Sequence, residues 1–278
     1  LMRPGQPTRP SKEPVFPRVY LPDRSIDQLL ALAGVREPGI GRALPVRFAE
    51  TRRMKSDATL DCENVAGFWP GSDPALSKQV VIVSAHYDHL GVASDGRIYN
   101  GADDNASGTC GLLALAEALA AHGPLACSVL LVWVSGEERG LWGSQAFVED
   151  PWFPEDGKPV LDLNLDMIGR EAPGRILVTP FDETHPAYNG AARLAKEMAR
   201  EEGFTDIGSN DGYYARSDHA NFAKLGIPIA FLSNGPHADY HEPTDDPEKI
   251  DGDKIRRVAR TVFRMLVALQ EKPRERAK

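Results

Sequence analysis

Residues 79–91 read QVVIVSAHYDHLG, a continuous run of mostly β-branched apolar residues that changes abruptly into titratable side chains. A short apolar run of this kind predicts a strand buried on both faces, as in the sheet of an α/β protein. Two more runs have this character, residues 128–134 (SVLLVWV) and 227–232 (IPIAFL). Reactive side chains are therefore expected where buried strands end.

Segments with helical and strand character alternate along the rest of the chain. An alanine- and leucine-rich segment at residues 106–121 predicts a helix, and residues 246–271 predict a long C-terminal helix with Pro247 in its first turn. Further strands are predicted at 44–50, 64–69, 161–167 and 175–179, and further helices at 142–149, 185–202 and 218–225. This alternation predicts an α/β sheet covered by helices on both faces.

The N-terminal segment differs from the rest in composition. Residues 1–22 contain six prolines and are expected to form an extended arm, followed by a short helix at 23–33. Residues 23–278 are expected to form one domain. No apolar core of a signal peptide is visible at the start of the sequence.

Composition disfavours several functional classes. The 32 Lys and Arg against 40 Asp and Glu give a net charge of −8, which disfavours a nucleic-acid partner. The longest apolar run is far shorter than the ~20 residues of a membrane span. Three cysteines cannot form a disulfide framework, and we interpret them as small buried thiols.

Residues that bind metals or move protons cluster where the strands end, or in the loop at residues 100–108 (NGADDNASG). They are His86, Asp103, Glu137, Glu138, Asp166 and His241. In open α/β sheets the ligand crevice lies at the carboxyl ends of the strands, so these side chains are expected to meet.

Carboxylates gathered at the edge of an apolar sheet repel one another unless a cation lies between them. Imidazole and carboxylate donors suit zinc, and five candidate ligands (His86, Asp103, Glu138, Asp166 and His241) suit two ions that share one carboxylate. Asp103, in its tight loop, is the expected bridge. Glu137 is then free to act on a metal-activated water, as in hydrolysis of an acyl bond.

The other histidines receive different interpretations. His89 is expected to contact a ligand rather than to be one, and His122 to cap the end of a helix. His185 and His237 are expected on the surface. The glycosylation sequon at Asn105 is interpreted as having no role, because it lies inside the metal loop.

At these residues the sequence resembles metallopeptidase family 28, the two-zinc aminopeptidases. The resemblance covers about residues 60–270 and rests on six segments in the family's order. They are HYDHLG at 86–91, NGADDNASG at 100–108, GEERGLWGS at 136–144, NLDMIG at 164–169, SDH at 217–219 and YHEPTDDPEKID at 240–251.

The resemblance implies that His86 and Asp166 hold one zinc ion, and that Glu138 and His241 hold the other. Asp103 would bridge the two ions. The implied fold is a mixed, mostly parallel sheet of about eight strands between helices. The protease-associated domain that many family members insert before residue 60 is not expected in this chain.

Three further roles follow from the resemblance. Glu137 would be the general acid and base, and Asp88 would orient the imidazole of His86. The family has a cis peptide bond after the bridging aspartate, which would fall between Asp103 and Asp104. A tyrosine three residues before the SDH segment would bind the substrate carbonyl; that residue is Tyr214, with Tyr213 as the alternative.

The expected activity is therefore removal of N-terminal residues from peptides by an exopeptidase with two Zn²⁺ per chain. Alternatives are a carboxypeptidase or dipeptidase, for which Arg170 is a candidate partner of a substrate carboxylate, and a one-zinc glutaminyl cyclase. A non-catalytic receptor-like domain is disfavoured, because all six key residues are present. We expect peptide substrates, no nucleic-acid partner, no membrane span, and a secreted or periplasmic location by analogy with bacterial relatives.

Overall fold

The apolar run that ends at His86 forms strand β3 (Gln79–His86), at the centre of the sheet. It lies between β6 (Ser128–Val134) and β7 (Lys158–Leu165), and both neighbours run parallel to it. Every residue of β3 from Val80 to His86 is buried. The third apolar run is β10 (Ile229–Ser233), which pairs in parallel with β7. The runs predicted as buried strands are thus confirmed.

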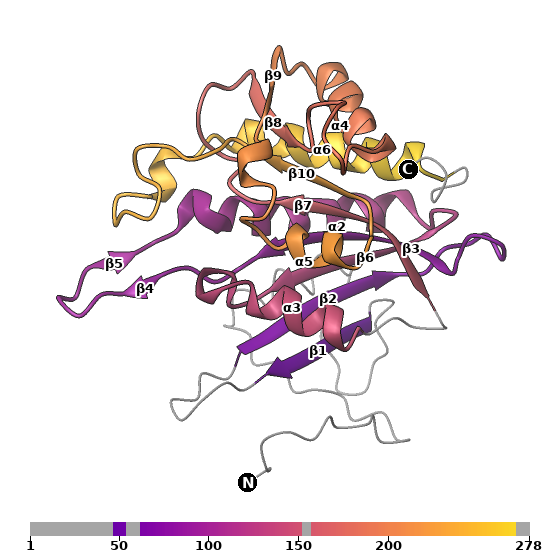
Figure 1. Cartoon of the computed structure of the whole chain (residues 1–278), viewed down its shortest axis with the longest axis horizontal. Coiled ribbons are helices and arrows are strands. Elements are labelled where there is room, and N and C mark those ends of the chain that lie inside the picture. The colour runs from indigo at the N-terminus through magenta and orange to yellow at the C-terminus, as the bar shows by residue number, and fades with distance from the viewer. Residues whose placement is uncertain (1–46, 54–61, 152–156, 271–278) are drawn as a thin grey trace, which may run out of the picture.

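The computed structural model describes residues 47–53, 62–151 and 157–270, the first of these ranges as backbone only. The predicted arm at 1–22 and helix at 23–33 lie outside these residues. In the described part, eight strands form one mixed sheet in the order β1-β2-β6-β3-β7-β10-β8-β9 (Figure 1). The remaining strands of the sheet are β1 (Arg47–Arg53), β2 (Cys62–Trp69), β8 (Arg175–Thr179) and β9 (Asp206–Ser209).

Helices cover both faces of this sheet, as predicted. One face carries α2 (Gly108–His122), α4 (Gly190–Glu201) and α6 (Gly252–Ala268), and the other carries α3 (Trp142–Glu149) and α5 (His219–Lys224) (Figure 1). Alternate residues of a strand point to opposite faces. Accordingly, Val81 and Val83 join the larger apolar core, whereas Val80 and Ile82 join the smaller one.

Two helices, α4 and α6, begin five or six residues later than predicted, and a side-chain cap explains each start. The Asn189 side chain accepts hydrogen bonds from the N–H groups of Ala191 and Ala192, so α4 begins at Gly190 rather than at 185. The Asp251 side chain accepts one from Lys254, so α6 begins at Gly252. Residues 247–249, including Pro247, form a separate 3-10 turn.

The short strands were not predicted. Besides β9 they are β4 (Gly91–Val92) and β5 (Ile98–Tyr99), which form a two-stranded ribbon that projects to the left in Figure 1. Two residues per strand are too few to show a periodic pattern in a sequence.

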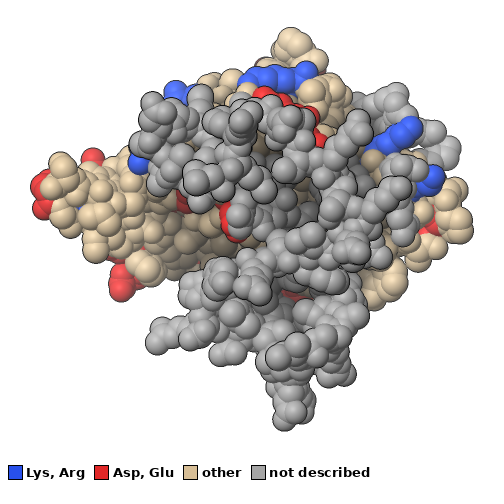
Figure 2. Space-filling view, turned by 90° about the horizontal axis from the view of Figure 1, so that it is seen from below, with Lys and Arg blue, Asp and Glu red and all other residues tan. Residues whose placement is uncertain are grey.

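Three further features are the apolar length of the helices, the exposure of the cysteines and the distribution of surface charge. None of the helices among the described residues is both long and apolar enough to cross a membrane. Of the three free cysteines, Cys127 is buried as expected, Cys62 is partly buried and Cys110 is exposed. In Figure 2, the described part of the face seen from below shows acidic and basic side chains in small separate groups.

Candidate metal centre

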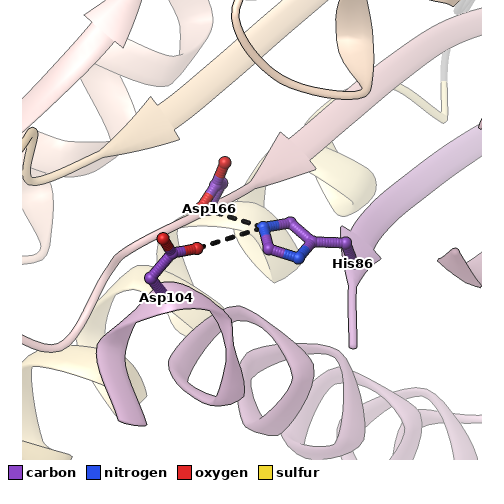
Figure 3. A group of neighbouring side chains, drawn as sticks. All are labelled: His86, Asp104 and Asp166. Atoms are coloured by element: carbon purple, nitrogen blue, oxygen red, sulfur yellow. Dashed lines mark ion pairs between the residues drawn. The ribbon is translucent and has the colours of Figure 1, made fainter. Parts of the chain in front are cut away.

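Three side chains from three elements meet at the carboxyl end of the sheet. His86 ends β3, Asp166 directly follows β7, and Asp104 lies in the irregular turn Ala102–Ser107 before α2. Nε2 of His86 lies 3.3 Å from Oδ1 of Asp104 and 3.4 Å from Oδ1 of Asp166 (Figure 3). Since β3 and β7 are parallel neighbours, the fold brings their last residues to one edge.

A second group shares Asp104. Nε2 of His241 lies 3.1 Å from Oδ2 of Asp104 and 3.1 Å from Oε2 of Glu138. Nδ1 of His89 lies 2.8 Å from Oε1, the other oxygen of Glu138. Asp104 therefore presents Oδ1 to the group of His86 and Oδ2 to the group of His241. The sequence predicted four of these residues to meet, namely His86, Glu138, Asp166 and His241, and they do.

Asp103 does not occupy the shared position expected of it. Its Oδ1 accepts a hydrogen bond from the N–H of Gly169 at 2.7 Å, and its Oδ2 lies 3.1 Å from Nδ2 of Asn234 and 3.1 Å from Nε2 of His237. Asp104 has non-helical torsions (φ −104°, ψ 87°), which direct the two neighbouring carboxylates differently. The expected bridge was thus wrong by one residue.

The cis peptide bond is likewise one residue later than expected. It lies between Asp104 and Asn105, not between Asp103 and Asp104 as expected. The side chain of Asn105 is buried and tied into the fold: it donates to the carbonyl of Leu165 and accepts from the N–H of Gly108.

Asp88 lies beside His86 as expected, but a different atom orients the imidazole. Nδ1 of His86 donates to the backbone carbonyl of Asp88 at 3.1 Å, whereas the Asp88 carboxylate is 3.8 Å away. That carboxylate instead accepts hydrogen bonds from the N–H groups of Glu137 at 3.1 Å and Glu138 at 3.3 Å. Asp88 thereby fixes the backbone from which both glutamates project.

Glu137 lines an open cavity next to the two groups. Burial, together with the nearby charges of Asp166, Asp218 and Glu138, raises the pKa of Glu137 to about 9. The cavity is lined by Asp104, Glu137, Asp166, Met167, Asn210, Tyr213, Arg216, Ser217, Phe231, Ser233, Gly235, Pro236, Tyr240 and His241. A carboxyl group beside a cavity is well placed to exchange a proton with a bound molecule.

The charges in the groups of His86 and His241 favour a bound cation. The neighbouring carboxylates Asp104 and Glu138 raise the pKa of His241 to about 10. Burial raises the pKa of Asp104, but the imidazoles of His241 and His86 outweigh it and hold that pKa below its usual value. Nε2 of His86 and Oδ1 of Asp166 are buried and form no hydrogen bond with other described residues. Nitrogen and oxygen donors left free in this way fit zinc.

Comparison with known proteins agrees with this geometry. Residues 64–266 match the model of peptidase family M28. The chain belongs to peptidase family M28. A probable leucine aminopeptidase of Trichophyton verrucosum (strain HKI 0517) is 31% identical over 199 residues, which cover 68% of this chain and 54% of that protein. Aminopeptidase YwaD of Bacillus subtilis (strain 168) is 28% identical over 225 residues, covering 77% and 46%.

Two solved structures share the fold. A zinc aminopeptidase from Bacillus subtilis superimposes with a TM-score of 0.60 at 25% identity, over 74% of this chain and 49% of that one. A glutaminyl cyclase from Porphyromonas gingivalis has a TM-score of 0.63 at 20% identity, over 80% and 83%, a likeness of fold alone. The chain spans about half the length of the curated relatives it matches.

The tyrosine expected at the M28 substrate site lies elsewhere. Tyr214 does not line the cavity; its ring packs against His185 at 4.9 Å and His219 at 5.9 Å between centroids. Tyr213, the alternative, does line the cavity, and so does Tyr240, which sequence reasoning missed. Tyr240 directly precedes His241 and stacks on its ring at 3.9 Å, so its position in the chain was the available signal.

Two other expectations for this member of family M28 concern His237 and Arg170. His237 was expected on the surface, yet its side chain is 1% exposed and contacts Asp103, because a buried carboxylate attracts a donor. Arg170 is held by two acidic residues: Nη2 lies 2.7 Å from Oδ2 of Asp239, and Nη1 lies 3.7 Å from Oδ1 of Asp245. Its guanidinium is therefore engaged within the protein.

The remaining histidines lie outside the site. His122 ends α2 and is exposed, with Nδ1 3.4 Å from the carbonyl oxygen of Gly123, close to the role expected of it. Nδ1 of His185 accepts a hydrogen bond from the N–H of Ala187, within the turn before α4. Neither imidazole shares a contact with the carboxylates described above.

Proposed function

We propose that this protein is a zinc-dependent aminopeptidase that removes N-terminal residues from peptides and binds two Zn²⁺ per chain. One observation carries the proposal: the two oxygens of Asp104 face two separate imidazole–carboxylate groups, next to a cavity that Glu137 lines. Membership of peptidase family M28 and the aminopeptidase names of the relatives support it.

The side chains divide into two sets of ligands. His86 and Asp166 would hold one ion, Glu138 and His241 the other, and Asp104 would contact both. Zinc in such a site polarises a carbonyl and makes water more acidic. The donors are all nitrogen and oxygen atoms, and none of the three cysteines belongs to either group.

Glu137 would carry the proton. With a cation beside it to stabilise its charged form, Glu137 would take a proton from the attacking water and deliver it to the leaving amine, so that the amide bond breaks without releasing a strong base. The backbone hydrogen bonds from Glu137 and Glu138 to the Asp88 carboxylate keep the two neighbouring glutamates in different roles. Glu138 turns toward His241, and Glu137 toward the cavity.

No observation favours the alternatives over this proposal. Arg170, the candidate for binding a substrate carboxylate, is paired with Asp239 and Asp245 instead. The likeness to the glutaminyl cyclase is one of fold at 20% identity. The two groups of candidate ligands that share Asp104, which we call the metal-type groups, provide more ligands than a one-zinc enzyme needs.

A substrate panel tests the proposal. Aminoacyl anilides with a free amine should be cleaved, while the same anilides with an acetylated amine and N-blocked dipeptides should not. Activity should disappear with phenanthroline and return with zinc. Cleavage of N-blocked dipeptides alone would indicate a carboxypeptidase, and full activity in metal-free protein would refute the proposal.

A further inference from the structure

The carboxylate of Asp103 is the centre of a buried hydrogen-bonded cluster beside the two metal-type groups. Its side chain is 0% exposed, and its oxygens contact Gly169, Asn234 and His237. Nδ1 of His237 accepts a hydrogen bond from the N–H of Asp239 at 3.2 Å. The proton of this imidazole is therefore on Nε2, which donates to Oδ2 of Asp103 at 3.1 Å.

A second buried carboxylate holds the same turn through its backbone. Oδ2 of Asp245 accepts hydrogen bonds from the N–H of Asp103 at 2.9 Å and of Asp104 at 3.1 Å. The backbone carbonyl of Asp245 accepts a third from the N–H of Ala102 at 3.1 Å. Asp245 is 0% exposed, and Arg170 provides the positive charge nearest to its other oxygen.

These contacts hold both ends of the loop 237–245, which carries His241. His237 at the start of the loop binds the Asp103 side chain, and Asp245 at its end binds the backbone around Asp103. Between them, His241 is 36% exposed on its side chain and has a left-handed backbone (φ 57°) that disfavours a non-glycine residue. The position of His241 therefore depends on the anchored ends of its loop.

We propose that Asp103, His237 and Asp245 form a clamp that sets the separation between the Asp104 carboxylate and the His241 imidazole, and so sets the zinc affinity of that group. We call these three residues the Asp103 clamp. The inference rests on the proposed function for the identity of the metal, and its residues are positioning residues that touch neither substrate nor metal. Groups that orient metal ligands typically change metal affinity by about 10–100-fold when they are removed.

His237 provides the sharpest test, because two substitutions separate its hydrogen bond from its bulk. His237→Leu fills much of the same space but has no N–H for Oδ2 of Asp103. His237→Gln places an amide N–H near the former position of Nε2. His122→Leu is the matched control, since His122 is exposed at the end of α2, away from both metal-type groups.

Zinc affinities are measured by chelator competition, and hydrogen–deuterium exchange is measured on the metal-free proteins. His237→Leu should weaken one of the two zinc affinities about 10-fold or more, leave the other within about threefold, and speed exchange across residues 237–245. His237→Gln should recover most of both effects, and His122→Leu should show neither. Unchanged affinity and exchange in His237→Leu would overturn the inference, as would equal weakening of both zinc affinities.

A second variant covers the case in which His237→Leu does not fold. Asp103→Asn keeps the size of the side chain, but its amide N–H₂ meets the donors of His237 or Asn234, so the same selective loss is expected. In the double variant with His237→Gln, the glutamine carbonyl can accept a hydrogen bond from the amide that Asp103→Asn introduces. The loss of zinc affinity in this double variant should therefore be smaller than the sum of the losses in the two single variants. Strict additivity would contradict a direct contact. Failure of wild type to cleave aminoacyl anilides would refute the proposed function while leaving these metal and exchange measurements valid.

Discussion

Nδ1 of His89 lies 2.8 Å from Oε1 of Glu138, the carboxylate oxygen that does not face His241. The His89 ring lies close to Gly101, where an added Cβ atom would be 2.5 Å from Cγ of His89. His89 thus lies against one oxygen of Glu138, while the other oxygen faces His241. A neighbour in contact with a ligand carboxylate helps to orient that carboxylate toward a metal ion.

Substitution of His89 should therefore weaken zinc binding without disturbing the fold. We predict that His89→Phe, which keeps a planar ring, lowers zinc affinity about 10–100-fold in chelator competition. His122→Phe, at the exposed end of α2, should change nothing. An unaltered affinity in His89→Phe would show that the contact with Glu138 does not position that carboxylate.

The neighbouring glutamates should respond differently to the same substitution. Glu137→Gln should lower kcat at least about 10²-fold with little change in KM or zinc content, because the amide cannot carry the proton. Glu138→Gln should lose zinc as well as rate. Kinetics and elemental analysis on the same preparations check both. Near-normal kcat in Glu137→Gln, or zinc loss in that variant alone, would mean that the two roles are exchanged.

Lys254 should make stability depend on alkaline pH. Its side chain is fully buried and donates to the carbonyl of Arg170, and burial lowers its pKa from 10.5 to about 8. Between these values the unfolded chain binds more protons than the folded protein, so this contribution to the free energy of unfolding increases with pH. Below about pH 8 the amine is charged in both states, and its contribution is constant.

Denaturant unfolding of wild type and Lys254→Met at several pH values checks this. The free energy of unfolding of wild type, relative to the variant, should rise by up to about 1.4 kcal/mol per pH unit above pH 8. Subtracting the variant removes the contributions of tyrosines and other groups that titrate in this range. A flat difference, or one that falls with pH, would refute the depressed pKa of Lys254.

The sequence predicts the ligand edge of the sheet well for a physical reason. Buried parallel strands need continuous apolar runs, and the carboxyl ends of such strands must lie together. His86 and Asp166 therefore meet, and Glu138 follows β6 at the same edge of the sheet. The centre of the fold and most of the candidate site follow from the apolar runs and the residues just after them.

What the sequence could not resolve depends on single torsions and on tertiary contacts. Asp103 and Asp104 are adjacent aspartates in one loop, and local torsions together with the contacts of Asp103 decide which carboxylate faces the imidazoles of His86 and His241. His237 looks like a surface residue until the buried carboxylate of Asp103 is placed beside it. Tyr213 and Tyr214 are likewise adjacent in one loop. Tyr214 packs against the smaller core, whereas Tyr213 lines the cavity.

The most direct test of the account is the number of zinc ions bound per chain when metal-free protein is titrated by calorimetry. Wild type should bind two, and Asp103→Asn should still reach two at saturating zinc, because the Asp103 carboxylate belongs to neither group of candidate ligands. Asp104→Asn should bind fewer than one, since it weakens the carboxylate that faces both groups. A single zinc ion in wild type, or two bound with unchanged affinity in Asp104→Asn, would contradict a metal centre built around Asp104.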